Sequence, residues 1–261
     1  RQLVESGAVD CILALGFEQM QPGALSGQWT DRPSPFSRFD QLCDEIAPYD
    51  VPIALRYFGG AGKEYMERYG VKPNLFAKVR AKASRHAAHN PLALFRRVVS
   101  EEEVMAAPMV FPEAGMTRLM ACPPTCGAAA AILVSRRCAD RMNLDRRVFI
   151  AAQAMTTDRP GTFAKRSMMA LVGDDMTREA AAQVYAQAGI GPGDIDVVEL
   201  HDCFAQNEVL IYEGLGLCPD GGAEKFVAAG DNTYGGRIVT NPSGGLLSKG
   251  HPLGATGLAQ C

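Results

Sequence analysis

Residues 197–204 read V-V-E-L-H-D-C-F, and residues 241–257 read N-P-S-G-G-L-L-S-K-G-H-P-L-G-A-T-G. In the first stretch, the apolar run 195–200 follows the turn sequence G-P-G-D and is typical of a buried strand. His201 and Cys203 come directly after this run. Clefts in open α/β sheets lie at the carboxyl ends of strands, so the pattern predicts a functional site here.

The second stretch places glycines where neither a strand nor a helix favours them. They allow positive φ angles and a close approach of the backbone to a ligand or another loop. These residues are Gly244, Gly245, Gly250, Gly254 and Gly257. His251 lies between a glycine and Pro252, just before residues 254–261, which begin like a helix. Because a helix N-terminus favours negative charge, the pattern is typical of a site that holds a thiolate or an oxyanion.

The composition describes a chain that can bury a sizeable core. It has 261 residues, 47% of them hydrophobic, and a net charge of -3. This charge does not suggest a nucleic-acid partner. One stretch is locally basic, and it predicts either a solvated helix face or contact with the phosphates of a nucleotide-like cofactor. Its basic residues are Lys78, Arg80, Lys82, Arg85, Arg96 and Arg97.

The eight cysteines are unevenly spaced, which does not resemble a disulfide framework and favours a reducing compartment. Cys122 and Cys126 flank P-P-T, but no second cysteine or histidine pair lies near them, so we expect no metal site. No apolar run has the length of a membrane span, and the amino end has no signal peptide. We therefore expect a soluble protein.

Strand and helix patterns alternate along much of the chain, which predicts an α/β fold with a sheet covered on both faces. The expected strands are 9–15, as a buried parallel strand, 128–134, 148–155 and 195–200. The expected helices are 53–69, 73–88, a short one from Ser135 to Met142, 177–188 opened by Thr177 and ended by Gly189, and one after Phe204 that stops near residues 214–216. Residues 18–120 show no strand alternation, and they are interpreted as a helical insertion.

The H-D-C-F sequence at 201–204 and the glycine-rich stretch at 241–257 resemble the thiolase superfamily. The match is closest to the sterol-carrier-protein-2-type thiolases, in which H-D-C-F stands in place of N-E-A-F. Further matches are A-L-G-F-E at 14–18, G-K-E-Y-M-E-R-Y-G at 62–70 and G-D-N-T-Y-G-G at 230–236. The resemblance extends over nearly the whole chain.

This resemblance implies an α/β fold of the layered α-β-α-β-α kind, with a mainly helical inserted loop domain. Residues 1–17 would be the tail of the N-terminal half, 18–121 the loop domain and 122–261 the C-terminal half. Both halves would be incomplete. The family's nucleophilic cysteine would lie upstream of Arg1, so the chain alone is expected to be inactive. One departure is T-C-G-A-A, in which Cys126 replaces the family's aspartate.

The resemblance also implies catalytic roles for three residues. His251 would take the proton of the nucleophilic thiol and donate a hydrogen bond to an oxyanion. Cys203 would be the acid/base that protonates the enolate carbon, and His201 would help to hold an oxyanion. The alternatives are structural: a loop histidine, a buried cysteine at a strand end and a histidine that orients its turn. Asp202 is expected to hold a loop.

The implied function is an acyltransferase that acts on acyl-CoA thioesters, by 3-ketoacyl-CoA thiolysis or by the reverse Claisen condensation. Coenzyme A would be a co-substrate contacted by Gly244, Gly245 and Ser248, with no permanent cofactor and no metal. Asn241 and Ser248 could also brace the glycine loop. A homodimer is expected, in the cytoplasm or, in a eukaryote, in the peroxisome.

Three alternative functions stand beside this one, the first suggested by a motif and the other two by the family resemblance. A phosphate-binding P-loop at 244–249 matches poorly, because the G-K-S/T ending is missing. A thiolase-like retro-aldol lyase of CoA thioesters, working with a partner protein, would use the same fold. A non-catalytic lipid- or acyl-CoA-binding protein is the third. Acyl-chain or sterol preference cannot be deduced from these patterns.

Overall fold

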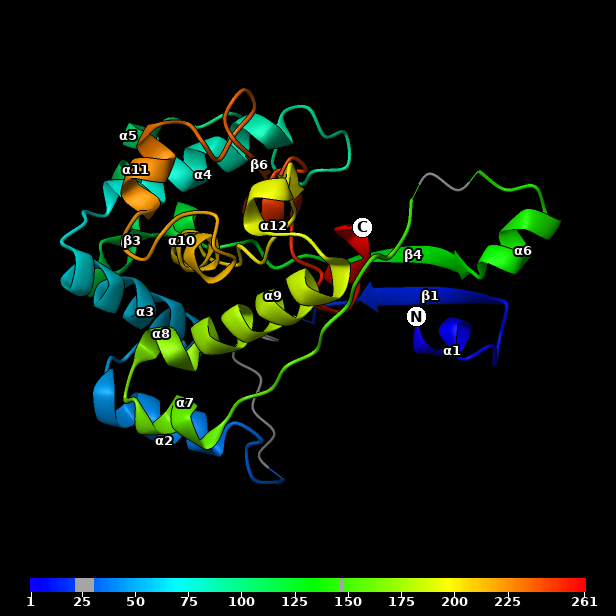
Figure 1. Ribbon diagram of the computed structural model, residues 1–261. Helices are drawn as coiled ribbons and strands as arrows, with labels where there is room; N and C mark the ends of the chain where they lie inside the picture. Colours follow the sequence, from blue (N-terminus) through cyan, green and yellow to red (C-terminus); the bar gives the residue numbers. More distant parts are fainter. Residues whose placement is uncertain (22–30, 146–147) are drawn as a thin grey trace.

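A computed structural model of the protein describes residues 1–21, 31–145 and 148–261. Figure 1 shows a body of packed helices, from which a ribbon of two strands projects as an arm. The arm consists of α1 (Gln2–Glu5), β1 (Cys11–Glu18), β4 (Gly127–Val134) and α6 (Arg136–Arg141). The last helix, α13 (Leu253–Ala259), packs against both strands of the arm. The C-terminus therefore lies where the arm meets the body (Figure 1).

The body is built from helices and a few short strands. Its helices are α2 (Ser37–Ile46), α3 (Ile53–Tyr69), α4 (Asn74–Ala87), α5 (Glu101–Ala106), α7 (Pro160–Ala164), α8 (Met168–Leu171), α9 (Asp174–Ala188), α10 (Ala205–Gly214), α11 (Ala223–Ala228) and α12 (Gly245–Lys249). Its strands are β2 (Met109–Phe111), β3 (Met116–Thr117), β5 (Val197–Val198) and β6 (Val239–Thr240). Short 3-10 turns cover Pro112–Ala114, Arg118–Met120 and Pro192–Asp194. The main core lies among α3, α4 and α10.

The two long helices of the predicted insertion are confirmed. α3 begins after Pro52 and ends at Gly70, whose φ of 71° closes the helix in the left-handed region. α4 begins at Asn74, one residue later than predicted, so that Pro73 is its N-cap and not a residue of its first turn. The predicted cap of α6 is also confirmed, because the Ser135 hydroxyl accepts a hydrogen bond from the backbone N–H of Cys138.

The helix α9 begins three residues before the predicted start. Thr177 is not its cap, because the Thr177 hydroxyl lies inside the first turn and donates to the carbonyl of Gly173. Two acidic residues, Asp174 and Asp175, occupy the first turn, where the helix dipole favours negative charge. Gly189 ends the helix as predicted, with a φ of 70°.

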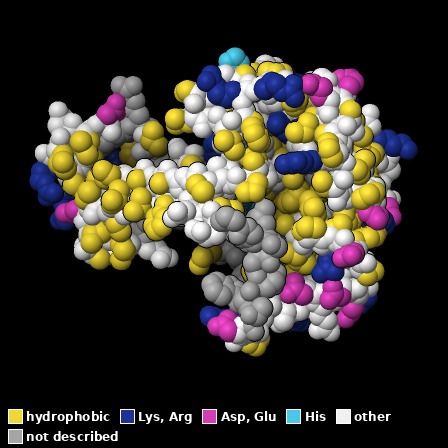
Figure 2. Space-filling view, turned by 180° about the vertical axis from the view of Figure 1, so that it is seen from behind, with side chains coloured by type: hydrophobic (Ala, Val, Ile, Leu, Met, Phe, Trp, Pro, Cys, Tyr) yellow, Lys and Arg dark blue, Asp and Glu magenta, His cyan; other side chains and the backbone are white. Residues whose placement is uncertain are grey.

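The strand expected near residues 9–15 is present as β1, but the prediction that it is buried and parallel was wrong. β1 pairs antiparallel with β4, from Cys11 opposite Val134 to Glu18 opposite Gly127. One face of this ribbon packs on α13, where the backbone of Gly16 approaches that of Gly254 so closely that a Cβ would not fit. The other face is exposed and apolar, as Figure 2 shows over the arm; it carries Leu13, Leu15, Phe17 and Ile132.

The strand predicted over 148–155 does not form. These residues are not paired with any strand among the residues that the structure describes, and Val148 and Met155 are 91% and 95% exposed. The strand predicted over 195–200 is shorter than expected. β5 has two residues, and it pairs parallel with β6 through Val197–Val239 and Val198–Thr240. The described part of the chain thus holds three two-stranded sheets in place of one broad sheet.

Candidate active site

The two stretches that carry the candidate catalytic residues meet through a third segment, residues 121–125. At one end of it, the backbone N–H of Cys122 donates to the carbonyl of Cys203 at 2.9 Å. At the other end, the N–H of His251 donates to Thr125 Oγ1 at 3.2 Å. As a result, the rings of His201 and His251 lie 4.9 Å apart between centroids, at 83° to each other. The structure therefore brings both predicted histidines into one site.

His251 is held in a defined orientation and protonation state. Its Nδ1 lies 2.7 Å from Thr256 Oγ1, and the Thr256 hydroxyl donates to the carbonyl of Pro252 at 3.0 Å. Because the Thr256 proton is already donated, the hydrogen-bond pattern assigns the imidazole proton to Nδ1 and leaves Nε2 as an acceptor. Burial, with the nearby His201 and Lys249, lowers the pKa of His251 to about 4. The ring is thus neutral at pH 7 and can take a proton at Nε2.

This lowered pKa of His251 makes the protein less stable in mild acid. Between pH 6.5 and about 4, the unfolded chain binds a proton at His251 that the folded chain does not, so the free energy of unfolding falls as pH falls. Replacing His251 by asparagine should reduce the slope of unfolding free energy against pH in this window by up to about 1.4 kcal/mol per pH unit. Urea titrations at several pH values would measure the slope. His89→Asn, at an exposed position, is the control, and an unchanged slope in His251→Asn would contradict the assignment.

Cys203 lies in the interior, two residues after His201, and is 5% exposed. Burial raises the pKa of its thiol well above the usual value, and the neighbouring Cys122 and Asp202 raise it further. The sulfur is therefore a protonated thiol at neutral pH. A thiol in this state can donate a proton to a carbanion, which is the role predicted from the sequence.

His201 lies at the edge of the site and faces a cavity. The cavity has a volume of about 290 Å³, and its wall includes His201, Asn207 and residues of α9 and α10. The Asn207 side chain donates to the His201 carbonyl at 2.6 Å and so fixes the backbone of the H-D-C-F turn. The surrounding protein lowers the pKa of the His201 imidazole by burial, although the residue as a whole is exposed.

Asp202 has the structural role expected for it. Its carboxylate is fully buried, and it accepts hydrogen bonds from the backbone N–H groups of Leu246, at 2.7 Å, and Leu247, at 3.3 Å. Burial and the nearby Glu208 carboxylate raise the pKa of Asp202 to about 7. The side chain ties the H-D-C-F turn to the beginning of α12.

Gly245 makes this contact between Asp202 and α12 feasible. Its φ is 62°, and a Cβ at this position would overlap Asp202 Oδ2. We expect Gly245→Ala to lower the free energy of unfolding by about 1–3 kcal/mol, because left-handed strain and displacement of the carboxylate act together. Denaturant titration would measure the loss. Gly257→Ala is the matched control in α13, since a Cβ there meets nothing within 4 Å. Equal stability of the two variants would be evidence against this account.

The three residues predicted to contact coenzyme A are all buried. Gly244 approaches the backbone of Ala87, Gly245 approaches Asp202, and the Ser248 hydroxyl accepts a hydrogen bond from buried Arg80 at 2.7 Å. These contacts brace the glycine loop, which is the alternative role given to Ser248 above. Contact with coenzyme A stays a prediction for them.

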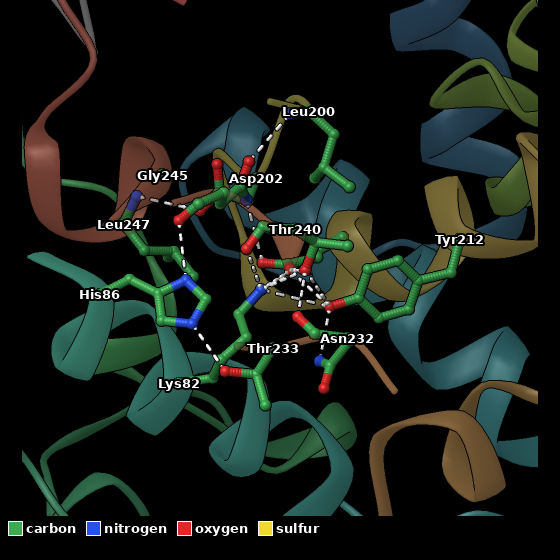
Figure 3. A network of polar contacts seen from close by, with 12 residues as sticks. Lys82, His86, Leu200, Asp202, Tyr212, Asn232, Thr233, Thr240, Gly245 and Leu247 are labelled. Atoms are coloured by element: carbon green, nitrogen blue, oxygen red, sulfur yellow. Dashed lines mark hydrogen bonds and ion pairs between the residues drawn. The ribbon is translucent and has the colours of Figure 1, made fainter. Parts of the chain in front are cut away.

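A buried polar network next to the site was missed by the sequence analysis. Lys82 of α4 forms an ion pair with Glu208 of α10, and its ammonium also donates to Thr240 Oγ1 at 2.7 Å and to the Thr240 carbonyl at 3.2 Å. Tyr212 donates to the same Glu208 carboxylate. Figure 3 shows the Lys82 nitrogen among Thr240 and Tyr212. Lys82 and Arg80 are 2% and 3% exposed, so the prediction of a solvated basic face was wrong for both.

Asn241 connects this network to the loop that carries His201 and Cys203. Its amide donates to Glu208 Oε2 at 3.3 Å, and its side-chain oxygen accepts from the N–H of Leu200 at 2.8 Å, directly before His201. His86 Nδ1 lies 3.0 Å from the Asn241 carbonyl (Figure 3 shows His86 beside Lys82). The backbone of Asn241 has a φ of 52°, which a non-glycine residue adopts only when its surroundings hold it there. Bracing of the glycine loop was one possibility left open for Asn241, and these contacts are of that kind.

No group of three or more histidine, cysteine or acidic side chains in the described ranges could hold a metal ion. Cys126 is exposed, and Cys122 makes its backbone contact with Cys203 instead. All eight cysteines are free thiols. Within the described part of the chain, no helix is both long and apolar enough to cross a membrane.

The sequence of this chain is similar to a known protein family and to several known proteins. Residues 162–261 match the family model "Thiolase C-terminal domain-like". Sterol carrier protein 2 from Oryctolagus cuniculus and from Homo sapiens are each 49% identical to the chain over 263 residues, which is 100% of this chain and 48% of each relative. Benzoylsuccinyl-CoA thiolase subunit BbsB from Thauera aromatica is 38% identical over 95% of this chain and 63% of its own. The chain thus spans about half the length of sterol carrier protein 2.

Solved structures show the same fold. The Ltp2-ChsH2(DUF35) aldolase matches with a TM-score of 0.77 at 24% identity, over 99% of this chain and 65% of that one. Human mitochondrial 3-ketoacyl-CoA thiolase matches with a TM-score of 0.63 at 16% identity, over 99% and 65%. These likenesses confirm the α/β fold predicted from the sequence. The domain limits at residues 17 and 121 stay predictions.

Proposed function

Because this chain belongs to the thiolase superfamily, we propose that it is part of an acyltransferase that cleaves 3-ketoacyl-CoA by thiolysis or runs the reverse Claisen condensation. The observation that carries the proposal is the juxtaposition of the His201 and His251 rings, whose centroids lie 4.9 Å apart, with the buried thiol of Cys203 two residues after His201 in the chain. One neutral base, one protonated acid and one further imidazole are the groups that this chemistry requires.

The proposed reaction divides the work among these groups. A cysteine thiolate outside this chain attacks the keto carbon after His251 Nε2 has taken its proton, and His251 then donates a hydrogen bond to the oxyanion. The bond between the α- and β-carbons breaks, and the Cys203 thiol protonates the enolate carbon of the departing acetyl-CoA. Coenzyme A then gives its thiol proton to the Cys203 thiolate and attacks the acyl-enzyme. The acyl group leaves as a thioester of coenzyme A, and the nucleophilic cysteine takes its proton back from His251. His201 stabilises an oxyanion in one of these steps.

Substrate and assembly follow from the same proposal. Acyl-CoA and coenzyme A are the proposed ligands, with Gly244, Gly245 and Ser248 as candidates for contact and no permanent cofactor. We also propose a homodimer, for which the exposed apolar face of the β1–β4 ribbon offers a surface. The free cysteines suit a reducing compartment, either the cytoplasm or a eukaryotic peroxisome.

The decisive experiment uses the full-length form, extended to the length of its thiolase relatives. Acetoacetyl-CoA and coenzyme A are supplied, and products are separated by chromatography. A thiolase converts each pair into two molecules of acetyl-CoA. Cleavage of a 3-hydroxyacyl-CoA without any need for free coenzyme A would instead favour the retro-aldol lyase. Binding of acyl-CoA with no turnover of either substrate would favour a lipid-binding role.

A further inference from the structure

Two of the free cysteines, Cys122 and Cys203, lie opposite each other on antiparallel segments. The N–H of Cys122 donates to the carbonyl of Cys203 at 2.9 Å, and the preceding residue, Ala121, pairs with Phe204 in an antiparallel bridge. Residues directly opposite in such a pair direct their side chains to the same face, with Cα atoms about 5.5 Å apart. This Cα spacing lies within the range that a disulfide spans, and the Cβ atoms, about 4.5–5.5 Å apart in such pairs, need to approach by about 1 Å for the bond to form.

The two sulfurs lie in surroundings that exclude most of the solvent. Cys203 is buried and Cys122 is half-buried, so only one of them is open to solvent. The two thiols also affect each other electrostatically, because Cys122 adds to the raised pKa of Cys203. Burial raises the pKa of Cys122 to about 12, with Asp202 adding to the effect. Since only thiolates react with oxidants, these pKa values predict slow oxidation that becomes faster as pH rises.

We propose that Cys122 and Cys203 form an intramolecular disulfide when the protein meets a peroxide. The sulfur of Cys122 attacks one oxygen of hydrogen peroxide, giving a sulfenic acid and one water. The thiol of Cys203 then displaces the second oxygen as water and forms the S–S bond. Together the two thiols lose two electrons and two protons, and the peroxide is reduced to two waters. A thiol reductant reverses the reaction.

The disulfide would have a direct consequence at the active site. A sulfur in a disulfide carries no proton, so Cys203 could no longer protonate the enolate. Oxidation would therefore stop turnover without any change at His251. This consequence rests on the proposed function, whereas formation of the disulfide depends only on the geometry.

The test maps the disulfide in the folded chain. The reduced protein is treated with hydrogen peroxide at pH 7 and pH 9, remaining thiols are alkylated, and a tryptic digest without reductant is analysed by mass spectrometry. Peptides 119–136 and 179–225 should be joined by a disulfide. The linked pair should form faster at pH 9 than at pH 7. Cys126→Ser and Cys218→Ser, which remove the other cysteine of each peptide, should keep the link. Cys122→Ser should lose it.

Two outcomes overturn the proposal: no link between these peptides in the folded protein, or a link that moves to Cys126 or Cys218. The same treatment in urea controls for unfolded chain, in which links should spread over all eight cysteines. Turnover of the full-length form then separates the two claims. Peroxide should lower the activity of the wild type, and dithiothreitol should restore it. In Cys122→Ser, dithiothreitol should restore none of the activity that peroxide removes. A mapped disulfide with full activity would refute the acid/base role of Cys203, not the disulfide.

Discussion

Replacing Cys203 by alanine in the full-length form should lower both thiolysis and condensation by about 10²- to 10⁴-fold, the usual contribution of a positioned acid or base. The thiol is protonated and enclosed, so no water molecule can take its place readily. Formation of the acyl-enzyme should persist in part, because the attack on the keto carbon depends on His251. Steady-state rates measure the first effect, and mass spectrometry of the acylated protein measures the second.

The matched control is Cys218→Ala, which removes a half-buried thiol near Glu213, Asp220 and Arg237. Its rates should stay within a factor of two or so of wild type, since changes outside the chemistry leave transition-state binding intact. Undiminished turnover in Cys203→Ala would refute the acid/base assignment. Loss of acylation as well as turnover would indicate that the thiol also shapes the substrate pocket.

Replacing Lys82 by methionine should lower the free energy of unfolding by about 3–5 kcal/mol. The change leaves Glu208 fully buried without its cation, and it removes two hydrogen bonds to Thr240. The double variant Lys82→Met with Glu208→Gln removes both charges, so it should be more stable than the single variant. Urea titration of all three proteins gives the comparison.

Arg85→Met is the control for Lys82→Met, because Arg85 is an exposed cation on the same helix. We expect a change within about 0.5 kcal/mol for it, as for most surface substitutions. If Lys82→Met is no less stable than Arg85→Met, the buried ion pair does not hold α4 against α10. If the double variant is less stable than the single one, the hydrogen bonds of Glu208 with Tyr212 and Asn241 outweigh the unpaired charge.

Helices were predictable where the signal is local. The ends of α3 and α4 depend on prolines and a glycine within one turn of the helix, and Ser135 caps α6 through a residue three positions away. The same holds for the loops that carry the candidate catalytic residues, because their glycines and prolines are adjacent in sequence. His201, Cys203 and His251 could thus be named in advance, although their roles stay predictions.

Features that depend on distant partners could not be predicted in this way. The partner of Lys82 lies 126 residues away, and nothing in the sequence of α4 separates a buried lysine from a solvated one. The strand predicted over 148–155 was wrong for the same reason, because an apolar run forms a strand only when a second strand pairs with it. β1 did find a partner, but the sequence does not encode whether that partner runs parallel or antiparallel.

The buried cations of α4 also limit how this chain can recombine with related genes. Arg80 and Lys82 meet Ser248 and Glu208, which lie 168 and 126 residues further along the chain. A crossover that exchanged residues 53–88 alone could bring in a helix without the cation that Glu208 needs, or a cation without its acid. We therefore expect viable hybrids between relatives to inherit α4 together with α10 and α12, so that segments far apart in the gene evolve as one unit.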